Sequence, residues 1–258
     1  MFTSDAAAPW VLALGTLVVW EAACWVFNIK KFVLPAPTTI AESIWKWREV
    51  VLIHAGQTLF TTLIGFAAAV AGGLILGVAV GYSRYLYKAL YPNLIAFNSV
   101  PKVAIVPVLV IWFGIGTMPA VITAFLLAFF PIVVNISTGL ATVEPELEDV
   151  LRSLGASKRD VFLKVGLPSS MPYFFASLKV AITLALVGSI ISETIAANSG
   201  IGYLMLNASS RFDVPLVFAG LMVAAVMGVV IYAITDRLEQ RITGWATRGR
   251  AARYGTGG

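Results

Sequence analysis

Long apolar stretches recur along this chain, and their length decides what it can fold into. A helix needs about 20 mostly apolar residues to cross the hydrocarbon core of a bilayer. The composition agrees, because 59% of the 258 residues are hydrophobic and 12% are charged, whereas about a quarter of a soluble domain is charged. The sequence therefore predicts an all-α polytopic membrane protein. The segments that meet the length rule are residues 9–28, 58–82, 118–139, 172–197 and 214–234.

Residues 85–116 form a further apolar region that is less regular. Its most apolar part, residues 103–114, is short, contains Pro107 and follows directly after Pro101 and Lys102. A proline removes a backbone donor and bends or ends a helix. We therefore expect a broken span entered through an interfacial helix, which brings the total to about six transmembrane helices.

Lysine and arginine are distributed unequally between the two sides of the predicted bundle. Cytoplasmic loops of membrane proteins carry the excess of these residues. With an even number of crossings both termini share one side, and that side is the richer one, so we expect both termini in the cytoplasm. The first span taken alone favours the reverse orientation of that helix, since Lys30 and Lys31 follow it directly. We assign the net charge of +5 to these loops and expect no nucleic-acid partner.

A short helix is expected between the first two spans, on the extracytoplasmic side. Two prolines mark the break before it, and Thr39 and Glu42 have the spacing of a capping box. We interpret this segment as an interfacial loop helix that covers the bundle and group it with the first span as residues 1–57. Its apolar face comprises Ile40, Ile44 and Trp47.

Small residues recur at every fourth position in two of the predicted spans. Such rows let helix backbones approach one another closely, which is how membrane helices pack. We favour packing within one subunit over a dimer face. The rows comprise Gly65, Ala69, Gly73, Gly77 and Gly81 in one span and Gly220, Ala224 and Gly228 in the last.

Residues 144–164 are too polar to lie in the membrane. Nine charged residues fall in this segment, and each would cost about 2.5–3.5 kcal/mol at the bilayer centre. The segment must therefore lie in water. Pro145 suits the first turn of a helix, and the apolar stripe of that helix comprises Leu147, Val150, Leu151 and Leu154.

Gly155 predicts the end of this helix, because glycine adopts the left-handed conformation of a C-terminal cap. Ser157 and Asp160 have the spacing of a capping box for a second short helix, and Pro168 closes the unit. The loop thus encodes two short helices joined by a sharp corner, each with an apolar face. These faces fold back on the chain's own bundle or enter a groove on a partner, and the residues alone do not decide between the two.

The stretch from Gly155 to Pro168 resembles the cytoplasmic loop of permease subunits in binding-protein-dependent ABC importers. In that loop a glycine is followed by nine residues and then by an aliphatic residue, any residue, leucine and proline. Here residues 156–164 separate Gly155 from the sequence VGLP at residues 165–168. The Glu-Ala-Ala that precedes the glycine in the family is replaced by Asp-Val-Leu at residues 149–151, which keeps only the acidity.

Three further stretches are similar to the nitrate, sulfonate and taurine branch of this family, which also includes permeases for vitamin precursors. They are VLPAPTTI at residues 33–40, VPKVAIVPVLVIWFGIG at residues 100–116 and GIGYL at residues 200–204. Glu193 also lies where this branch often has a glutamate. The likeness covers residues 33–245.

The resemblance implies a permease domain at residues 58–245 with a coupling loop at residues 144–168, followed by a basic cytoplasmic tail at residues 246–258 that we expect to be disordered. It implies that two copies form a pore, surrounded by lipid, in the inner membrane of a bacterium. A separate ATPase subunit would bind ATP and magnesium and grip the loop, and a solute-binding protein would deliver the solute. We expect no cofactor in this chain. The residues implied in coupling are Asp149, Gly155, Ala156, Ser157, Leu167 and Pro168.

The residues leave two other function classes to weigh. An ion-coupled secondary transporter would need an intramembrane acid such as Glu21, but Lys179 is expected near the opposite face, too far away to pair with it. A membrane enzyme is disfavoured because His54 and Cys24 are the only histidine and cysteine, which also leaves no Cys/His metal cluster. The chain has no Gly-Lys dipeptide, and therefore no Walker loop for ATP hydrolysis.

Several polar residues within the spans are candidates for lining the path of a small polar or anionic solute, such as a sulfonate, nitrate or vitamin precursor. Polar side chains in membrane helices serve more often as packing contacts, and in the resembled family specificity resides mostly in the binding protein. We expect Glu193 near the outer end of its span, where water reaches it. The candidates are Asn98, Asn135, Ser189, Ser192 and Glu193.

Overall fold

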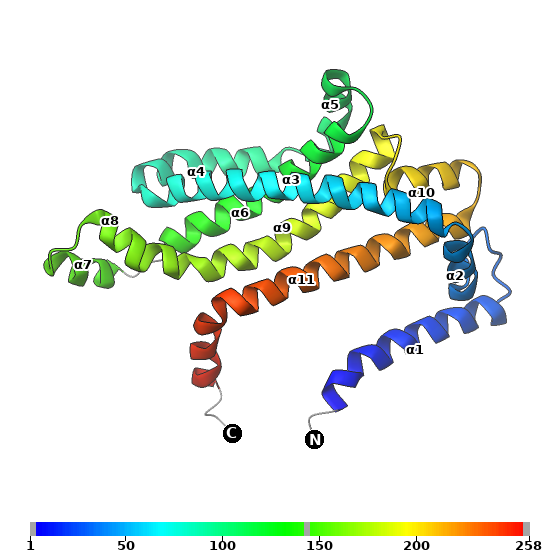
Figure 1. Cartoon of the computed structure of the whole chain (residues 1–258), viewed down its shortest axis with the longest axis horizontal. Helices are drawn as coiled ribbons and strands as arrows, with labels where there is room; N and C mark the ends of the chain where they lie inside the picture. The colour runs from blue at the N-terminus through cyan, green and yellow to red at the C-terminus, as the bar shows by residue number, and fades with distance from the viewer. Residues whose placement is uncertain (1–3, 142–144, 255–258) are drawn as a thin grey trace.

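The computed structural model describes residues 4–141 and 145–254, and within these ranges every regular element is a helix (Figure 1). The elements are α1 (Ser4–Val26), α2 (Pro37–Lys46), α3 (Arg48–Tyr82), α4 (Arg84–Ser99), η1 (Lys102–Ile105), α5 (Val106–Phe113), α6 (Thr117–Ala141), α7 (Pro145–Ser153), α8 (Lys158–Val161), η2 (Phe162–Gly166), α9 (Leu167–Ala196), α10 (Ile201–Ser210) and α11 (Val214–Tyr254). Helices α7 and α8 lie at one end of the long axis, and α2 and α10 lie at the other (Figure 1).

Among the described residues, four helices are long and apolar enough to cross a membrane. They are Arg48–Tyr82, Thr117–Ala141, Lys158–Ala196 and Val214–Ile242. The bent pair Tyr85–Ser99 and Lys102–Phe113 adds a fifth if it is one span, and α1 contains a shorter apolar stretch, Val11–Val26. The prediction of an all-α polytopic membrane protein is confirmed. The predicted total of about six is reached only if the bent pair and α1 each cross once.

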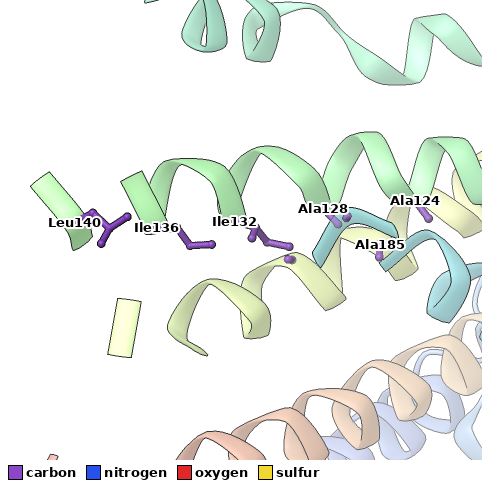
Figure 2. Packing of buried hydrophobic residues seen from close by; sticks show 8 residues of the cluster. Ala124, Ala128, Ile132, Ile136, Leu140 and Ala185 are labelled. Atoms are coloured by element: carbon purple, nitrogen blue, oxygen red, sulfur yellow. The ribbon is translucent and has the colours of Figure 1, made fainter. Parts of the chain in front are cut away.

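The core of the bundle is the contact of α6 with α3 and α9. Figure 2 shows Ala124, Ala128, Ile132, Ile136 and Leu140 in a row along α6, with Ala185 of α9 beside them. The glycines of α3 face this row. A Cβ atom on Gly73 would lie 2.7 Å from Cγ2 of Ile132, and one on Gly77 would lie 2.9 Å from Cβ of Ile136. The predicted small-residue row therefore packs within one chain.

The second small-residue row also packs within the chain. A Cβ atom on Gly220 of α11 would lie 2.5 Å from Cγ of Met205 in α10, and one on Gly228 would lie 3.4 Å from Cδ2 of Leu186 in α9. These contacts hold α11 against α9 and α10. The interpretation of both rows as packing within one subunit is therefore confirmed.

Helix α2 covers the end of the bundle where α10 lies, but it does not begin at the predicted residue. Its first residue is Pro37 and its N-cap is Ala36, with no side-chain capping bond. Thr39 is thus already inside the helix, so the predicted capping box of Thr39 and Glu42 is wrong. A proline is well suited to the first helical position, because its missing N–H would have no partner there in any case. The predicted apolar face is confirmed, since Ile40, Ile44 and Trp47 pack against α10 and α11.

The predicted break in the region of residues 85–116 is present. The bent pair turns by 73° between Ser99 and Lys102. Val100 and Pro101 are extended there, and η1 restarts the helix. The fixed φ of Pro101 and its missing N–H explain why the helix stops at this point.

The C-terminal tail differs from the expectation. We predicted a disordered tail at residues 246–258, whereas α11 continues as helix to Tyr254. Alanine and arginine in this stretch are among the strongest helix formers, and they offset its high charge. Residues 255–258 lie outside the described ranges.

Candidate functional site

A sharp corner joins α7 to α8 at the end of the molecule opposite α10. Gly155 has φ +85, and its amide donates to the carbonyl of Arg152 at 3.0 Å. The amide of Ala156 donates to the carbonyl of Leu151 at 3.0 Å. This pair of bonds is the Schellman motif, which satisfies carbonyls at a helix end and requires a left-handed residue at the glycine position. The predicted end of the first helix at Gly155 is confirmed.

The second helix is capped at its start. The hydroxyl of Ser157 accepts from the amide of Asp160 at 3.2 Å, and the carboxylate of Asp160 accepts from the amide of Ser157 at 3.1 Å. The predicted capping box is therefore confirmed, with aspartate in the place of the usual glutamate. Both ends of the connection between the helices are thus fixed by hydrogen bonds. We call α7, the turn at Gly155 and α8 the α7–α8 corner.

The second helix does not end at Pro168, so this prediction is wrong. A continuous helix runs from Lys158 to Ala196, through α8, η2 and α9. The element η2 is a π-helix in which the amide of Leu167 donates to the carbonyl of Phe162. The wider turn shifts the carbonyls ahead of Pro168, which relieves the clash that a proline ring causes in a regular α-helix.

Large apolar side chains of the corner are exposed. Val150 is 59% exposed and Leu154 is 79% exposed, whereas Val161 is buried. The side chain of Leu147 lies outside the described part of the structure, as does residue 144. The apolar face of α7 at Val150 and Leu154 therefore does not fold back on the chain's own bundle, which was one of the two readings left open by the sequence.

The six predicted coupling residues divide into two groups. Asp149, Gly155, Ala156 and Ser157 lie together in the α7–α8 corner, and all except the half-buried Ala156 are exposed. Leu167 and Pro168 lie in the first turn of α9, half-buried, where the corner joins the bundle. The first group is therefore open to solvent at the end of the molecule, and the second lies where the corner continues into α9.

Two of the predicted path residues lie outside the core. Asn98 is exposed on the last turn of α4, and its side-chain oxygen accepts from Lys102 Nζ at 2.7 Å. Asn135 of α6 is half-buried and donates to the carbonyl of Pro131 at 2.8 Å.

The other three path candidates are buried in the bundle. Ser189 is fully buried, and Ser192 and Glu193 are each 1% exposed. The expectation that water reaches Glu193 is therefore wrong. Its carboxylate accepts from Thr58 Oγ1 at 2.8 Å and from Thr61 Oγ1 at 3.3 Å, and Thr61 also bonds the hydroxyl of Ser189. Gly200, in the turn that follows α9, packs directly against this carboxylate.

The start of α10 completes this polar cluster. The amide of Gly202 donates to Glu193 at 3.1 Å, and the amide of Ile201 donates to Thr58 at 2.8 Å. The amide of Gly200 donates to His54 Nδ1 at 3.0 Å. Glu193 thus supplies hydrogen-bond acceptors to the N-terminus of α10, whose first amides have no partner within the helix. Sequence reasoning missed Thr58 and Thr61. His54, Thr58 and Thr61 follow one another at intervals of four and three residues, but this spacing alone does not indicate a site, because Glu193, the acceptor of both threonines, lies more than 130 residues away.

The two charged residues weighed for a secondary transporter do not meet. Glu21 accepts from the amide and the hydroxyl of Thr38, at 3.1 and 2.8 Å. Lys179 of α9 pairs instead with two carboxylates of α11, at 3.1 Å to Asp236 and 2.6 Å to Glu239. The predicted separation of Glu21 and Lys179 is consistent with these contacts.

Known proteins similar to this chain are transport permeases. The formylaminopyrimidine transport permease protein ThiX of Halalkalibacterium halodurans is 31% identical, over 93% of this chain and 96% of that protein. The riboflavin transport system permease protein RibX of Chloroflexus aurantiacus is 31% identical, over 89% and 86% of the two chains. The putative aliphatic sulfonates transport permease protein SsuC of Escherichia coli is 30% identical, over 92% and 91%.

The fold is similar to that of a solved transporter. A chain of the MetNI methionine ABC transporter in an inward-facing conformation matches 81% of this chain and 98% of its own length, with a TM-score of 0.63 at 17% identity. At that identity the likeness concerns the fold alone. Residues 49–244 match the family model of binding-protein-dependent transport system inner membrane components. Since this match covers most of the chain, the protein belongs to the family of inner-membrane components of binding-protein-dependent transport systems.

Proposed function

We propose that this chain is the permease subunit of an ATP-driven importer and forms the translocation path for a small polar or anionic solute. Family membership supports the permease role. The relatives named for formylaminopyrimidine, riboflavin and aliphatic sulfonates support a small solute such as a sulfonate, nitrate or vitamin precursor. The chain itself would bind no cofactor, and ATP with magnesium would bind to a separate subunit.

The observation that carries the proposal is the α7–α8 corner. It is stiffened by the Schellman motif at Gly155 and by the capping box of Ser157 and Asp160. It also exposes Val150 and Leu154 to water. A rigid unit with an exposed apolar face fits a hydrophobic groove on another protein. We assign that groove to the ATPase subunit, with the corner and both termini in the cytoplasm.

A movement of the corner would reach the whole bundle. The helix from Lys158 to Ala196 is continuous, so displacement of α8 moves α9, and α6 is packed along α9 through the cluster of Figure 2. Two copies of the chain would enclose the path between them in the lipid of the inner membrane. A solute-binding protein would dock at the opposite end, where α2 and α10 lie.

Replacement of Gly155 tests the coupling role. A Cβ atom there would meet nothing within 4 Å, so the demand on this position is its φ of +85. Proline cannot adopt this angle, whereas asparagine tolerates it. We expect Gly155→Pro to stay in the membrane but to lose co-purification with the ATPase, and Gly155→Asn to retain it.

Uptake into proteoliposomes separates the function classes. The full complex with ATP and the binding protein should accumulate solute, and the purified chain with a proton gradient alone should not. Uptake driven by the gradient alone would favour an ion-coupled secondary transporter. A Gly155→Pro chain that binds the ATPase and transports normally would show that the corner is not the coupling site.

A further inference from the structure

A buried lysine lies at the break of the broken span. Lys102 begins η1, directly after Pro101, and is only 7% exposed. Its ammonium donates to the backbone carbonyl of Asn98 at 3.0 Å and to the side-chain oxygen of Asn98 at 2.7 Å. It also lies 6.0 Å from the centre of the Phe130 ring.

The charge of Lys102 has only neutral partners. Within residues 4–141 and 145–254, no carboxylate with a described side chain forms an ion pair with it. Lys179 is different, since it holds Asp236 and Glu239. A buried ammonium is normally paired with an acid, because the cost of removing it from water is high. The positive field of Lys102 is therefore available to a further group.

The bond to Lys102 fixes the orientation of the Asn98 amide. The amide oxygen faces the ammonium, so the NH₂ group of Asn98 is directed away from it. Asn98 is exposed, and no acceptor on a described residue bonds its Nδ2. An amide presents two donors on this nitrogen. The exposed side of α4 thus offers hydrogen-bond donors backed by a positive charge.

The backbone at the break is exposed on the surface of the single chain. Val100 is 44% exposed and Pro101 is also exposed, and both are extended. Non-helical backbone at membrane depth is tolerated only where it is buried in protein or lines a water-filled cavity. Taken as one span, the bent pair places the break at membrane depth, where this exposed backbone must line water or contact another protein rather than lipid.

We propose that Asn98 and Lys102 form an anion-recognition point on the translocation path, where the NH₂ group of Asn98 contacts a small anion such as a sulfonate or nitrate. Lys102 acts as the positioning residue, because it orients the amide and supplies the uncompensated charge. This inference rests on the proposed permease function and narrows its solute to an anion. A neutral solute would gain only the hydrogen bonds.

A simpler role for Lys102 is a C-terminal cap of α4, since a cation near the last carbonyls of a helix is favourable. Asn98→Asp separates the two roles. The variant keeps the lysine and the backbone carbonyl that it bonds, and it places a carboxylate beside the ammonium. The cap is retained while the charge is cancelled.

The test uses the complete complex in proteoliposomes, with ethanesulfonate and nitrate as anionic probes and riboflavin as a neutral one. We expect the wild-type complex to take up an anion. Lys102→Gln and Asn98→Asp should raise the KM for that anion about tenfold or more. Lys102→Arg should retain most of the uptake. Co-purification with the ATPase and ATP hydrolysis should be unchanged in all three variants.

Each other outcome overturns one specific proposal. If the wild-type complex takes up neither ethanesulfonate nor nitrate, with or without uptake of riboflavin, the proposed anion site is wrong. If Asn98→Asp transports the anion with an unchanged KM, Lys102 is only a helix cap. If the wild-type chain fails to bind the ATPase, or its uptake needs no ATP, the permease proposal itself fails. Should Lys102→Gln not fold, Asn98→Asp still decides the question.

Discussion

Glu193 shows how a single acid is accommodated inside a membrane bundle. Its carboxylate is held by Thr58 and Thr61 of α3 and by the amide of Gly202 in α10. No described basic residue forms an ion pair with it. A polar group in this position is costly unless hydrogen bonds satisfy it. The side chain therefore fastens α3, α9 and α10 together rather than facing a solute.

Replacement of Glu193 should loosen this end of the bundle. Glu193→Ala would leave buried donors without an acceptor, and we expect the free energy of unfolding to fall by about 1–3 kcal/mol. Glu193→Gln keeps the shape of the side chain and one acceptor oxygen, and should lower the free energy of unfolding by less. Thermal unfolding in detergent measures both. The control Glu49→Gln changes an acid whose side chain is 84% exposed, and should shift the free energy by less than about 0.5 kcal/mol. If Glu193→Ala is as stable as the wild type, the carboxylate of Glu193 does not hold α3, α9 and α10 together.

The close contact of α3 with α6 depends on the fit between the glycines of α3 and the apolar row of α6. A Cβ atom on Gly73 would lie 2.7 Å from Ile132, closer than packed atoms tolerate. We expect Gly73→Ala to push the helices apart and to lower the free energy of unfolding by about 1–3 kcal/mol. Thermal unfolding in detergent is again the measurement.

Two variants make the Gly73 prediction specific. Gly56→Ala lies in the same helix with nothing within 4 Å of its Cβ, so it should be neutral or stabilising through higher helix propensity. Ile132→Ala removes the facing side chain and should recover part of the stability in combination with Gly73→Ala. If the double variant is no better than the sum of the single ones, the two residues are not the point of contact.

The elements differ in how far the sequence predicts them, and the reason is the range of the interactions. The α7–α8 corner depends on neighbours within six residues, and its glycine cap and capping box are predicted correctly. The small-residue row of α3 is predicted because its period is intrinsic to a helix. The prediction that the second helix ends at Pro168 is wrong, because no local sequence pattern indicates the π-helical turn that accommodates this proline. The burial of Glu193 depends on residues more than 130 positions away, which periodicity does not show.

At the scale of the whole molecule, one continuous helix connects the exposed corner to the far end of the bundle. It runs from Lys158 to Ala196 and is tied at Glu193 to α3 and α10. Part way along it, Lys179 holds Asp236 and Glu239 of α11. The three side chains are 15–33% exposed. Helix α11 is therefore linked to the helix that the ATPase would move.

Neutralising Lys179 separates the stability of this link from its mechanical role. Lys179→Met leaves two part-buried carboxylates without their cation, and we expect the free energy of unfolding to fall by about 1–3 kcal/mol, less than for a fully buried pair. The triple variant Lys179→Met, Asp236→Asn, Glu239→Gln removes the unpaired carboxylates as well, and should recover stability because neutral replacement of an ion pair is often tolerated.

If the link also transmits motion, the triple variant should still bind the ATPase yet transport less solute for each ATP hydrolysed. A triple variant with full transport would show that the ion pairs only stabilise the fold, and that packing alone moves α11 with α9.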